Sequence, residues 1–239
     1  PASVAHIRVF ICGSAPLTEQ TFSDWEQRTG HRILERYGMS ETIINTSNPL
    51  QGERVAGTVG FALPGQQVRV ASEDGVVVPT GEVGRIEVGG PNVFQGYWRM
   101  PEKTAEEIRP DGFFITGDLG VQAADGRLSI VGRSKDLVIS GGYNVYPKEV
   151  EVALDEMPQV AESAVIGVPH PDFGEAVVAV VVPAGDEVTQ ADVDAALGDR
   201  LARFKQPKRV INVAELPRNT MGKVQKNLLR DQHGDLFAS

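Results

Sequence analysis

The stretch GRSKDLVISGGYNVYPKEVE, residues 132–151, marks the point at which the chain passes from one structural pattern to another. Within it, the run from Leu137 to Ile139 predicts a short strand, and Gly141-Gly142 predicts a bend. Pro147 follows, and because proline is favoured in the first turn of a helix, we expect a helix from there to about Met157. A strand, a bend and a helix in this order indicate that a second domain begins at about residue 134.

Downstream of this stretch, the alternation of apolar and polar residues continues to predict short strands and helices. The expected strands are Ser163–Val168, Ala176–Val182 and Arg209–Val213, and the expected helices run from Thr189 or Gln190 to about Arg203 and from Lys223 to Asp231. This β-α-β-β-α-β order predicts a small α+β domain over residues 134–239.

Upstream, the chain opens with an α/β pattern that extends to about residue 56. The run from Ile7 to Ile11 predicts a strand, and Thr18 is a suitable N-cap for a helix that ends before Gly30. The run from Arg32 to Glu35 predicts a second strand, and this spacing is typical of a parallel βαβ crossover.

From about residue 57 to residue 133 the sequence predicts antiparallel sheet. Three Asp-Gly pairs lie near short apolar or alternating runs, and Asp-Gly tolerates the positive φ of a tight hairpin turn. The clearest strands are Val68–Ala71, Gly84–Val88 and Leu128–Val131. The fold class that we expect for the whole chain is therefore α/β plus α+β.

The composition is that of a soluble globular chain and excludes several function classes. The 23 Lys and Arg residues against 32 Asp and Glu residues give a net charge of −9, which argues against a general electrostatic grip on nucleic acid or on an anionic membrane. The longest apolar run, Ala176 to Val182, is far shorter than the ~20 residues of a membrane-spanning helix. The single cysteine, Cys12, excludes an intrachain disulfide framework and fits the reducing environment of the cytoplasm, where we expect the protein.

Positive charge is nevertheless concentrated near the C-terminus. Residues 200–230 contain nine Lys or Arg residues and one acidic residue, Glu215. A solvated helix face, a nucleic-acid site and a site for a polyanionic small molecule such as a nucleotide or coenzyme A all fit such a segment. Because Phe204 is its one aromatic residue and nucleic-acid stacking needs several, the small molecule ranks above nucleic acid.

Five short motifs occur in order along the chain: YGMSE at 37–41, TGD at 116–118, GRSKD at 132–136, GGYNVYPKEVE at 141–151 and PRNTMGK at 217–223. Together they resemble the later core motifs of the adenylate-forming superfamily, which contains acyl-CoA synthetases, luciferase and non-ribosomal peptide adenylation domains. The resemblance covers nearly all of the chain. It implies an ATP-dependent, AMP-forming acyl-CoA synthetase, in which a carboxylate attacks ATP to give an acyl-adenylate and coenzyme A then displaces AMP.

The resemblance also implies a particular domain organisation. Residues 1–133 would be the C-terminal portion of a large adenylation core, and residues 134–239 a small, mobile C-terminal lid with Lys135 as the hinge. The Gly/Ser/Thr-rich phosphate loop of the family is absent, and the chain has no initial Met. We therefore expect a part of an enzyme about twice this length, inactive without its N-terminal half. A non-catalytic module that binds AMP or coenzyme A remains the alternative.

A nucleotide site follows from the resemblance, with Asp118 accepting the ribose hydroxyls, Arg133 also on the ribose and Thr116 close by. The loop from Gly13 to Pro16 would pack against adenine, although a generic tight turn explains this loop almost as well. The expected nucleotide-binding residues are Gly13, Ser14, Ala15, Pro16, Tyr37, Gly38, Thr116, Asp118 and Arg133.

The residues that the resemblance assigns to catalysis are Lys223, Glu41 and Ser40. Glu41 would bind Mg²⁺ through a hard carboxylate oxygen, unless it merely caps a following turn. Ser40 would offer its hydroxyl to phosphate. Lys223 would stabilise the transition state of adenylation as a point charge, whereas its other interpretation is an ordinary exposed lysine. In an exposed position it would also be a target for a protein acetyltransferase, which would remove its charge.

Two further sites concern the other substrates. By the resemblance, Gly141, Gly142 and Tyr143 would line the path of the coenzyme A pantetheine, although bend glycines would look the same. Arg36 stands directly before the first motif, and a guanidinium beside an acyl pocket suits a second carboxylate. This resembles the malonyl-CoA synthetase branch, so we expect malonate or a similar short dicarboxylate as the acid. A structural salt bridge of Arg36 and another acid substrate both stay open.

Overall fold

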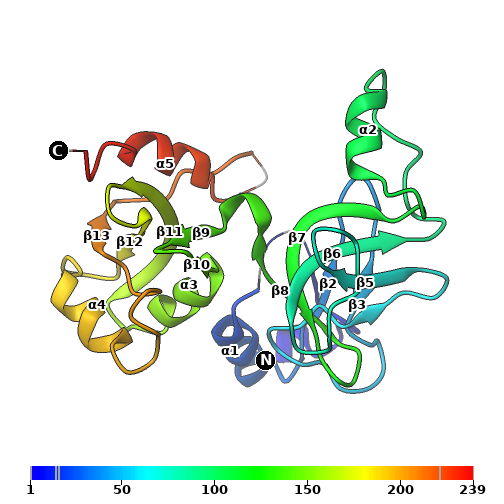
Figure 1. The fold of residues 1–239 in the computed structure, drawn as a ribbon. Helices are drawn as coiled ribbons and strands as arrows, with labels where there is room; N and C mark the ends of the chain where they lie inside the picture. The colour runs from blue at the N-terminus through cyan, green and yellow to red at the C-terminus, as the bar shows by residue number, and fades with distance from the viewer. Residues whose placement is uncertain (1, 14, 16, 221, 239) are drawn as a thin grey trace. The chain divides into compact units, whose positions relative to one another are not determined.

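The computed structural model describes residues 2–13, 15, 17–220 and 222–238 of the chain (Figure 1). The chain divides into two compact units, Pro1–Ser134, called unit 1 below, and Lys135–Ser239, called unit 2. The expected α/β plus α+β class is confirmed, because unit 1 contains a parallel strand pair joined by a helix and unit 2 mixes helices with a mainly antiparallel sheet.

Unit 1 begins with a 3-10 helix, η1 (Ala2–Val4), and then forms the predicted βαβ arrangement. Strand β1 (Ile11–Cys12) pairs in parallel with β2 (Leu34–Tyr37), and helix α1 (Glu19–Thr29) connects them. The Thr18 hydroxyl accepts a hydrogen bond from the Thr21 amide at 3.1 Å and so caps α1, as predicted.

The two predicted strands of this region are displaced. The residue register of β1 with β2 covers Ile11 and Cys12, and the Leu34 amide donates to the Phe10 carbonyl oxygen just before it, so the expected strand Ile7–Ile11 is wrong over most of its length. The second strand lies two residues later than predicted at its end. Two short strands, β3 (Thr46–Ser47) and β4 (Phe61–Ala62), then pair antiparallel and complete the sheet in the order β1-β2-β3-β4.

The second sheet of unit 1 is an antiparallel meander. Its strands follow each other in the order β5 (Gln67–Ala71), β6 (Val83–Gly89), β7 (Phe114–Gln122) and β8 (Leu128–Arg133). The three strands predicted for this region lie within β5, β6 and β8, and the turn at Asp125-Gly126 joins β7 to β8 as expected. The core beneath this sheet includes Val70, Ile86, Leu128 and the buried ring of Tyr37.

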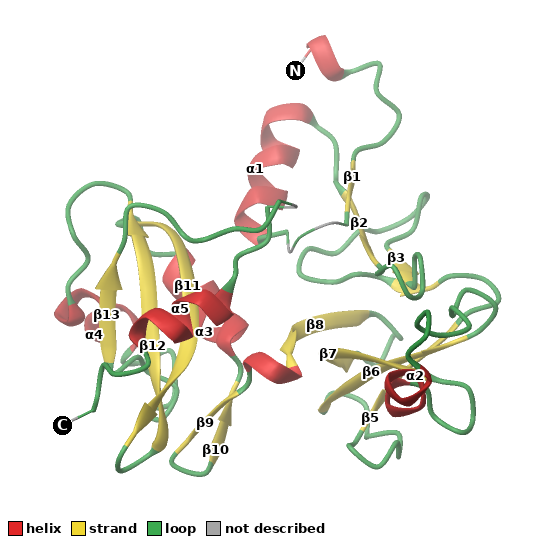
Figure 2. Cartoon of the chain, turned by 90° about the horizontal axis from the view of Figure 1, so that it is seen from above, coloured by secondary structure: helices red, strands yellow, loops and turns green. Residues whose placement is uncertain are grey.

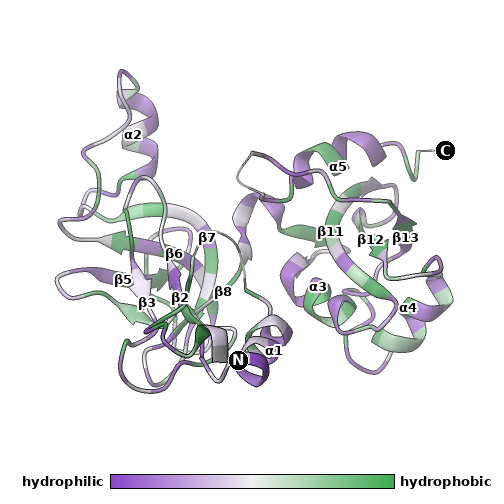
Figure 3. Cartoon of the chain, turned by 180° about the vertical axis from the view of Figure 1, so that it is seen from behind, coloured by the Kyte–Doolittle hydropathy of each residue, from purple (hydrophilic) through white to green (hydrophobic). Residues whose placement is uncertain are grey.

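Helix α2 (Pro101–Glu107) lies between β6 and β7 and was not predicted. It has a proline in its first turn, buries none of its residues, and stands away from the sheet strands in Figure 1. Figure 3 shows that its residues are mostly hydrophilic. A short polar helix of this kind has no apolar periodicity by which sequence could identify it.

Unit 2 is built on a long antiparallel hairpin, β11 (Val160–His170) and β12 (Gly174–Pro183), which Figure 2 shows side by side. Around it lie the elements β9 (Val138–Ser140), β10 (Tyr143–Val145), α3 (Pro147–Asp155), α4 (Gln190–Leu197), β13 (Arg209–Asn212) and α5 (Lys226–His233). The hairpin contains both of the long strands predicted here. A further 3-10 helix, η2 (Ser134–Asp136), crosses the boundary between the units.

The side chains of β12 alternate between two apolar cores. Val177, Ala179 and Val181 face α3 and α4, whereas Val178 and Val180 face Leu229 of α5 and the C-terminal segment. The helices therefore cover opposite faces of the sheet, as Figure 1 shows.

Two predicted helix ends in unit 2 are wrong. Helix α4 ends at Leu197 instead of about Arg203, because Gly198 follows and the Gln206 amide donates to the carbonyl oxygens of Gly198 and Leu201. Helix α5 begins at Lys226 instead of Lys223, because the residues before it form a β-bridged turn.

Candidate functional site

Asp118 of β7 is the centre of a buried polar cluster in unit 1. It is 4% exposed and pairs in register with Arg133 of β8, whose Nε lies 2.7 Å from its Oδ1. The Tyr37 hydroxyl donates to Asp118 Oδ2 at 2.5 Å. The structure thus brings together three residues that are far apart in the sequence and that were all expected to bind nucleotide.

Thr116 supports this cluster from the same strand. Its hydroxyl accepts a hydrogen bond from the Asp118 amide at 3.1 Å and donates to the Ile86 carbonyl oxygen at 2.8 Å. The pKa of Tyr37 is raised, first by burial and then by the charge and hydrogen bond of Asp118, so the phenol remains a donor throughout the physiological range. Asp118 is therefore a carboxyl group with both oxygens contacted by well-placed donors, Tyr37 on Oδ2 and Arg133 on Oδ1.

The adenine loop expected at residues 13–16 lies only partly within the described residues, because Ser14 and Pro16 lie outside them. Gly13 follows β1, and a side chain there would come within 3.0 Å of the Arg36 carbonyl oxygen on β2. Ala15 is exposed in a bend. Gly13 is therefore required by the close approach of two parallel strands at their carboxyl ends, the usual location of ligand sites in α/β sheets.

Gly38 and the loop after it form a tight and strained corner. A Cβ atom at Gly38 would lie 2.0 Å from the Ile43 carbonyl oxygen, so only glycine fits. Ile43 itself has a φ of 61° and is 69% exposed, a conformation that a β-branched residue rarely adopts. The segment between these residues contains Ser40, which is exposed, and Glu41, which is half-buried.

Glu41 is held by a segment that sequence reasoning did not select as part of the site. The Phe94 amide donates to the Glu41 carbonyl oxygen at 2.8 Å, and the Tyr97 hydroxyl lies 3.1 Å from Glu41 Oε1. A contact that spans 56 residues leaves no local pattern.

Arg36 of β2 is the residue expected to bind the second carboxylate of the acid substrate. Its Nε is buried and has no hydrogen-bond partner among the described residues, and none of the ion pairs found among them involves its guanidinium. The ion pairs found among the described residues therefore do not include the structural salt bridge considered above for Arg36. A buried, unpartnered guanidinium nitrogen is costly unless an anion pairs with it.

In unit 2, Lys223 is presented on an exposed turn. Arg218 and Val224 form an antiparallel bridge, and the Asn219 amide donates to the Lys223 carbonyl oxygen at 3.0 Å. The Lys223 amide in turn donates to Asn219 Oδ1 at 3.0 Å. The backbone of Lys223 is thus fixed, whereas its side chain is exposed and has no ion-pair partner in the part of the chain that the structure describes.

The residues expected near coenzyme A form a second turn of unit 2. Gly141 and Gly142, with φ values of 58° and 83°, connect β9 to β10, and such a pair of positive values suits a tight hairpin turn. Tyr143 is exposed and stacks on Phe204 with ring centroids 4.6 Å apart. Lys135, the expected hinge, is exposed in η2.

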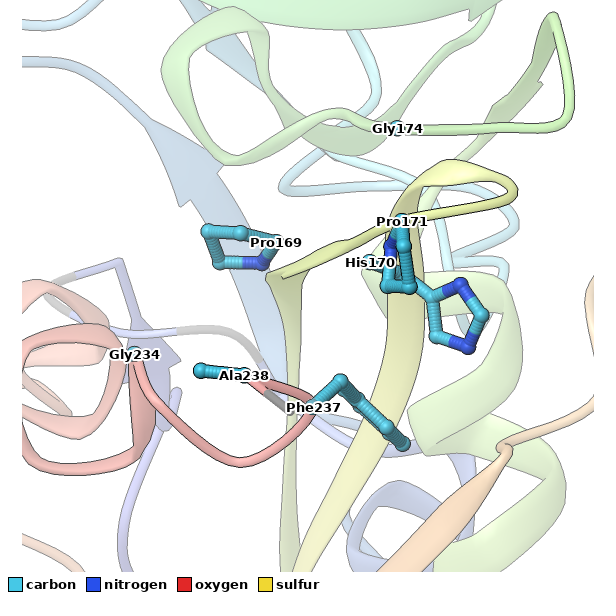
Figure 4. A pocket seen from close by; sticks show the side chains of 7 residues that line it. All are labelled: Pro169, His170, Pro171, Gly174, Gly234, Phe237 and Ala238. Atoms are coloured by element: carbon cyan, nitrogen blue, oxygen red, sulfur yellow. The ribbon is translucent and has the colours of Figure 1, made fainter.

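A shallow cavity of about 440 Å³ lies elsewhere in unit 2 (Figure 4). It is lined by Pro169, His170, Pro171, Gly174, Gly234, Phe237 and Ala238. None of the residues expected from the sequence lines it. The candidate site is therefore defined by the polar clusters above and not by this cavity.

Two further findings concern metal binding and membrane-spanning helices. Within the described ranges, no three His, Cys, Asp or Glu residues are grouped as a metal cage would need, so Glu41 would share a cation with substrate oxygens. The same part of the chain contains no helix that has the length and apolar character needed to cross a membrane.

Comparison with known proteins identifies the family of the chain that contains these clusters. Two family models match the chain, "AMP-binding enzyme" over residues 2–98 and "AMP-binding enzyme C-terminal domain" over residues 149–223. The chain belongs to the AMP-binding enzymes. The polar cluster of unit 1 and the Lys223 turn of unit 2 are thus parts of an AMP-binding enzyme, and the chain matches the C-terminal part of that fold.

Individual AMP-binding enzymes resemble the chain over almost all of its length. A probable CoA ligase of Humulus lupulus is 41% identical over 96% of this chain and 40% of its own length. The malonate–CoA ligase of Arabidopsis thaliana is 40% identical over 94% of this chain and 38% of its own. Among solved structures, ATP-bound MatB of Rhodopseudomonas palustris matches with a TM-score of 0.96 and 59% identity, over 99% of this chain and 47% of MatB. The chain spans less than half the length of each of these proteins.

Proposed function

We propose that the full-length protein containing this chain is an acid–CoA ligase that activates malonate, or a similar short dicarboxylate, with ATP and transfers the acyl group to coenzyme A. The observation that carries the proposal is the cluster of the buried Tyr37 and Asp118 with the half-buried Arg133, together with the Nε of Arg36, which has no partner among the described residues. In this proposal residues 1–133 belong to the adenylation core and residues 134–239 form its C-terminal lid. The names of the relatives, which include a malonate–CoA ligase, support it.

The nucleotide end of the site suits the ribose of AMP or ATP. The Asp118 carboxylate pairs with Arg133 and is oriented by Tyr37, and in the proposal it accepts the ribose hydroxyl groups. Gly13 and Gly38 allow close approach of neighbouring backbone where the strands end, since a Cβ atom would meet the carbonyl oxygens of Arg36 and Ile43. In the proposal, the loop that begins at Gly13 packs against adenine.

In the chemical step, Glu41 would bind the metal ion and Lys223 would stabilise negative charge on the reacting oxygens. The Glu41 carboxylate, with one oxygen against Tyr97, offers a hard oxygen of the type that Mg²⁺ prefers, and the exposed Ser40 hydroxyl is available to a phosphate. Magnesium, when bound, would neutralise phosphate charge. Lys223 would add a mobile positive charge to the oxygens between which the acyl-phosphate bond forms, as pyrophosphate leaves.

The choice of acid follows from Arg36. A monocarboxylic acyl chain beside this residue would leave the buried Nε without a partner, whereas the second carboxylate of malonate would accept from it. A dicarboxylate is thus favoured over an apolar acid by the cost of leaving the buried Nε of Arg36 without an acceptor.

For the second half-reaction, Gly141, Gly142 and Tyr143 would contact coenzyme A. The turn of two glycines allows close approach of the pantetheine chain, and the stacked pair of Tyr143 and Phe204 offers an exposed aromatic surface. Lys135 lies at the boundary of the two units and would be the hinge of the lid.

The test is product analysis with the full-length enzyme. Incubation with ATP, Mg²⁺, coenzyme A and malonate is expected to give malonyl-CoA and AMP, with kcat/KM for malonate exceeding that for butyrate. Arg36→Leu is expected to lower kcat/KM for malonate about 100-fold, because it removes a charge-assisted hydrogen bond to a buried carboxylate. The same variant should not lower kcat/KM for butyrate, because butyrate has no second carboxylate to pair with Arg36.

Equal kcat/KM for malonate and butyrate in the wild-type enzyme would contradict the dicarboxylate assignment. Binding of AMP or coenzyme A without thioester formation from any acid would favour the non-catalytic module instead.

A further inference from the structure

The segment from Asn92 to Tyr97 holds the loop of Glu41 at three points. The Asn92 side-chain amide donates to the Thr42 carbonyl oxygen at 2.8 Å, and the Phe94 amide donates to the Glu41 carbonyl oxygen at 2.8 Å. The third point is the Tyr97 hydroxyl, 3.1 Å from Glu41 Oε1. Both the backbone and the carboxylate of Glu41 are therefore positioned by one segment.

Tyr97 is itself fixed from two sides. Its amide donates to the Thr104 hydroxyl at 3.0 Å, and its ring packs edge-on against Phe94 at 4.8 Å. Phe94 in turn packs against Phe114 of β7 at 5.5 Å. The hydroxyl is thus carried to Glu41 on a ring that has little freedom to move.

Glu107 of α2 is the second acceptor for the Tyr97 hydroxyl, at 2.6 Å. Glu107 also pairs with Lys103, so its charge is compensated without Tyr97. The end of α2 is anchored by Arg109, whose guanidinium contacts the buried Glu87 at 2.7 Å. The position of Glu107 is therefore as well determined as that of Tyr97.

The two carboxylates compete for one hydrogen. A phenol carries a single O–H, and Glu41 has no other hydrogen-bond partner for its carboxylate among the residues that the structure describes. We expect the Tyr97 hydroxyl to donate to Glu41, because Lys103 already forms an ion pair with Glu107. The hydrogen bond from Tyr97 to Glu41 Oε1 leaves the second carboxylate oxygen of Glu41 for a cation.

We propose that Tyr97 is a positioning residue for Glu41, and that its hydroxyl, shared with Glu107, orients the Glu41 carboxylate for a divalent cation. The inference rests on the proposed function, in which Glu41 binds Mg²⁺ together with ATP. Groups that orient a metal ligand commonly affect metal affinity without touching the metal.

The experiment measures cation binding without turnover. Mn²⁺ replaces Mg²⁺ and is titrated by electron paramagnetic resonance into the full-length enzyme, with ATP below the enzyme concentration and no acid present. Tyr97→Phe is expected to raise the Kd of Mn²⁺ about tenfold. The matched control Tyr146→Phe also removes a phenol hydroxyl, one with no hydrogen bond among the described residues, and should leave the Kd unchanged.

A Glu41→Gln background separates positioning from a merely structural role. There, Tyr97→Phe is expected to add no further loss, because the carboxylate it orients is gone. If Tyr97→Phe does not fold, Lys103→Met serves instead. It leaves Glu107 dependent on the Tyr97 hydrogen and should weaken Mn²⁺ binding in the same direction.

The outcomes distinguish this inference from the proposed function. If Glu41→Gln weakens Mn²⁺ binding but Tyr97→Phe does not, or if the two losses are independent, the positioning role is wrong while the proposed function stands. If the wild-type enzyme binds no Mn²⁺ with ATP, or Glu41→Gln binds it normally, the role of Glu41 fails and the inference fails with it.

Discussion

Units 1 and 2 hold their charged site residues in opposite ways. Asp118 of unit 1 is buried on a central strand, with Tyr37 at 2.5 Å and Arg133 at 2.7 Å. Lys223 of unit 2 has a fixed backbone on a bridged turn but an exposed side chain without an ion-pair partner in the described chain. A binding group gains from a rigid, prearranged geometry, whereas a charge that must follow a reacting phosphate gains from rotatable bonds.

The largest expected effect concerns Lys223, the exposed residue of this comparison. Lys223→Ala in the full-length enzyme should lower the rate of acyl-adenylate formation by about 10²- to 10³-fold, the usual result of removing one stabilising donor from a transition state. Thioester formation from supplied acyl-adenylate should change less than about threefold. Rapid-quench kinetics of the two half-reactions measures both, and Lys148→Ala is a matched control on α3.

An equal loss in both half-reactions would show that Lys223 maintains structure or substrate binding. The contrast between a fixed binding group in unit 1 and a mobile catalytic charge in unit 2 would then not hold for Lys223.

For the buried residues Tyr37 and Asp118 we expect a smaller effect, on the Kd of ATP and not on a reaction rate. Tyr37→Phe should raise the Kd of ATP about tenfold, because Asp118 loses a donor that holds its carboxylate in place. Asp118→Asn should raise it about tenfold more, since the charge that attracts hydroxyl donors is also lost. Equilibrium dialysis with labelled ATP measures the binding directly.

These two variants should leave a bound acid at normal affinity. If Tyr37→Phe binds ATP like the wild type, the hydroxyl of Tyr37 supports packing alone, and the prearranged geometry is not needed.

The smallest expected effect concerns Asp155, a half-buried carboxyl group of unit 2. Burial raises the pKa of Asp155, and a hydrogen bond from Ser163 offsets this only in part. A raised carboxyl pKa means that the folded state holds the proton more tightly than the unfolded state. Stability contributed by this group is therefore lost as pH rises from its ordinary pKa of 3.8 through the raised value.

Asp155→Asn should abolish that loss while keeping an oxygen for Ser163. The variant is expected to be more stable than wild type near neutral pH, with the difference vanishing below about pH 4. Hydrogen exchange of the β11 and β12 amides against pH measures it. A difference independent of pH would contradict the raised pKa.

The sequence predicted those elements whose limits depend on local chemistry. Thr18 and Gly30 determined both ends of α1, and the Asp125-Gly126 turn identified the hairpin of β7 and β8. Where the limit depends on distant partners, the prediction was wrong, as with β1, which extends only as far as β2 pairs with it. Helix α2 was missed because it buries no apolar face.

The same distinction applies to the site. Motif resemblance selected Tyr37, Thr116, Asp118 and Arg133, and the structure brings these four side chains into one cluster, although their roles remain a proposal. Tyr97 was missed because its contact with Glu41 depends on folding of the 92–97 segment over a distant loop. The exposed side chain of Lys223 and the buried Nε of Arg36, which has no hydrogen-bond partner among the described residues, are likewise visible only in three dimensions.

The most direct test of the central claim is acid-dependent exchange of labelled pyrophosphate into ATP by the full-length enzyme, measured without coenzyme A. The account predicts rapid exchange with malonate, slow exchange with butyrate and none without acid, because adenylation precedes and does not require the thiol. Absence of exchange with malonate and with every other acid, in an enzyme that binds ATP, would contradict it.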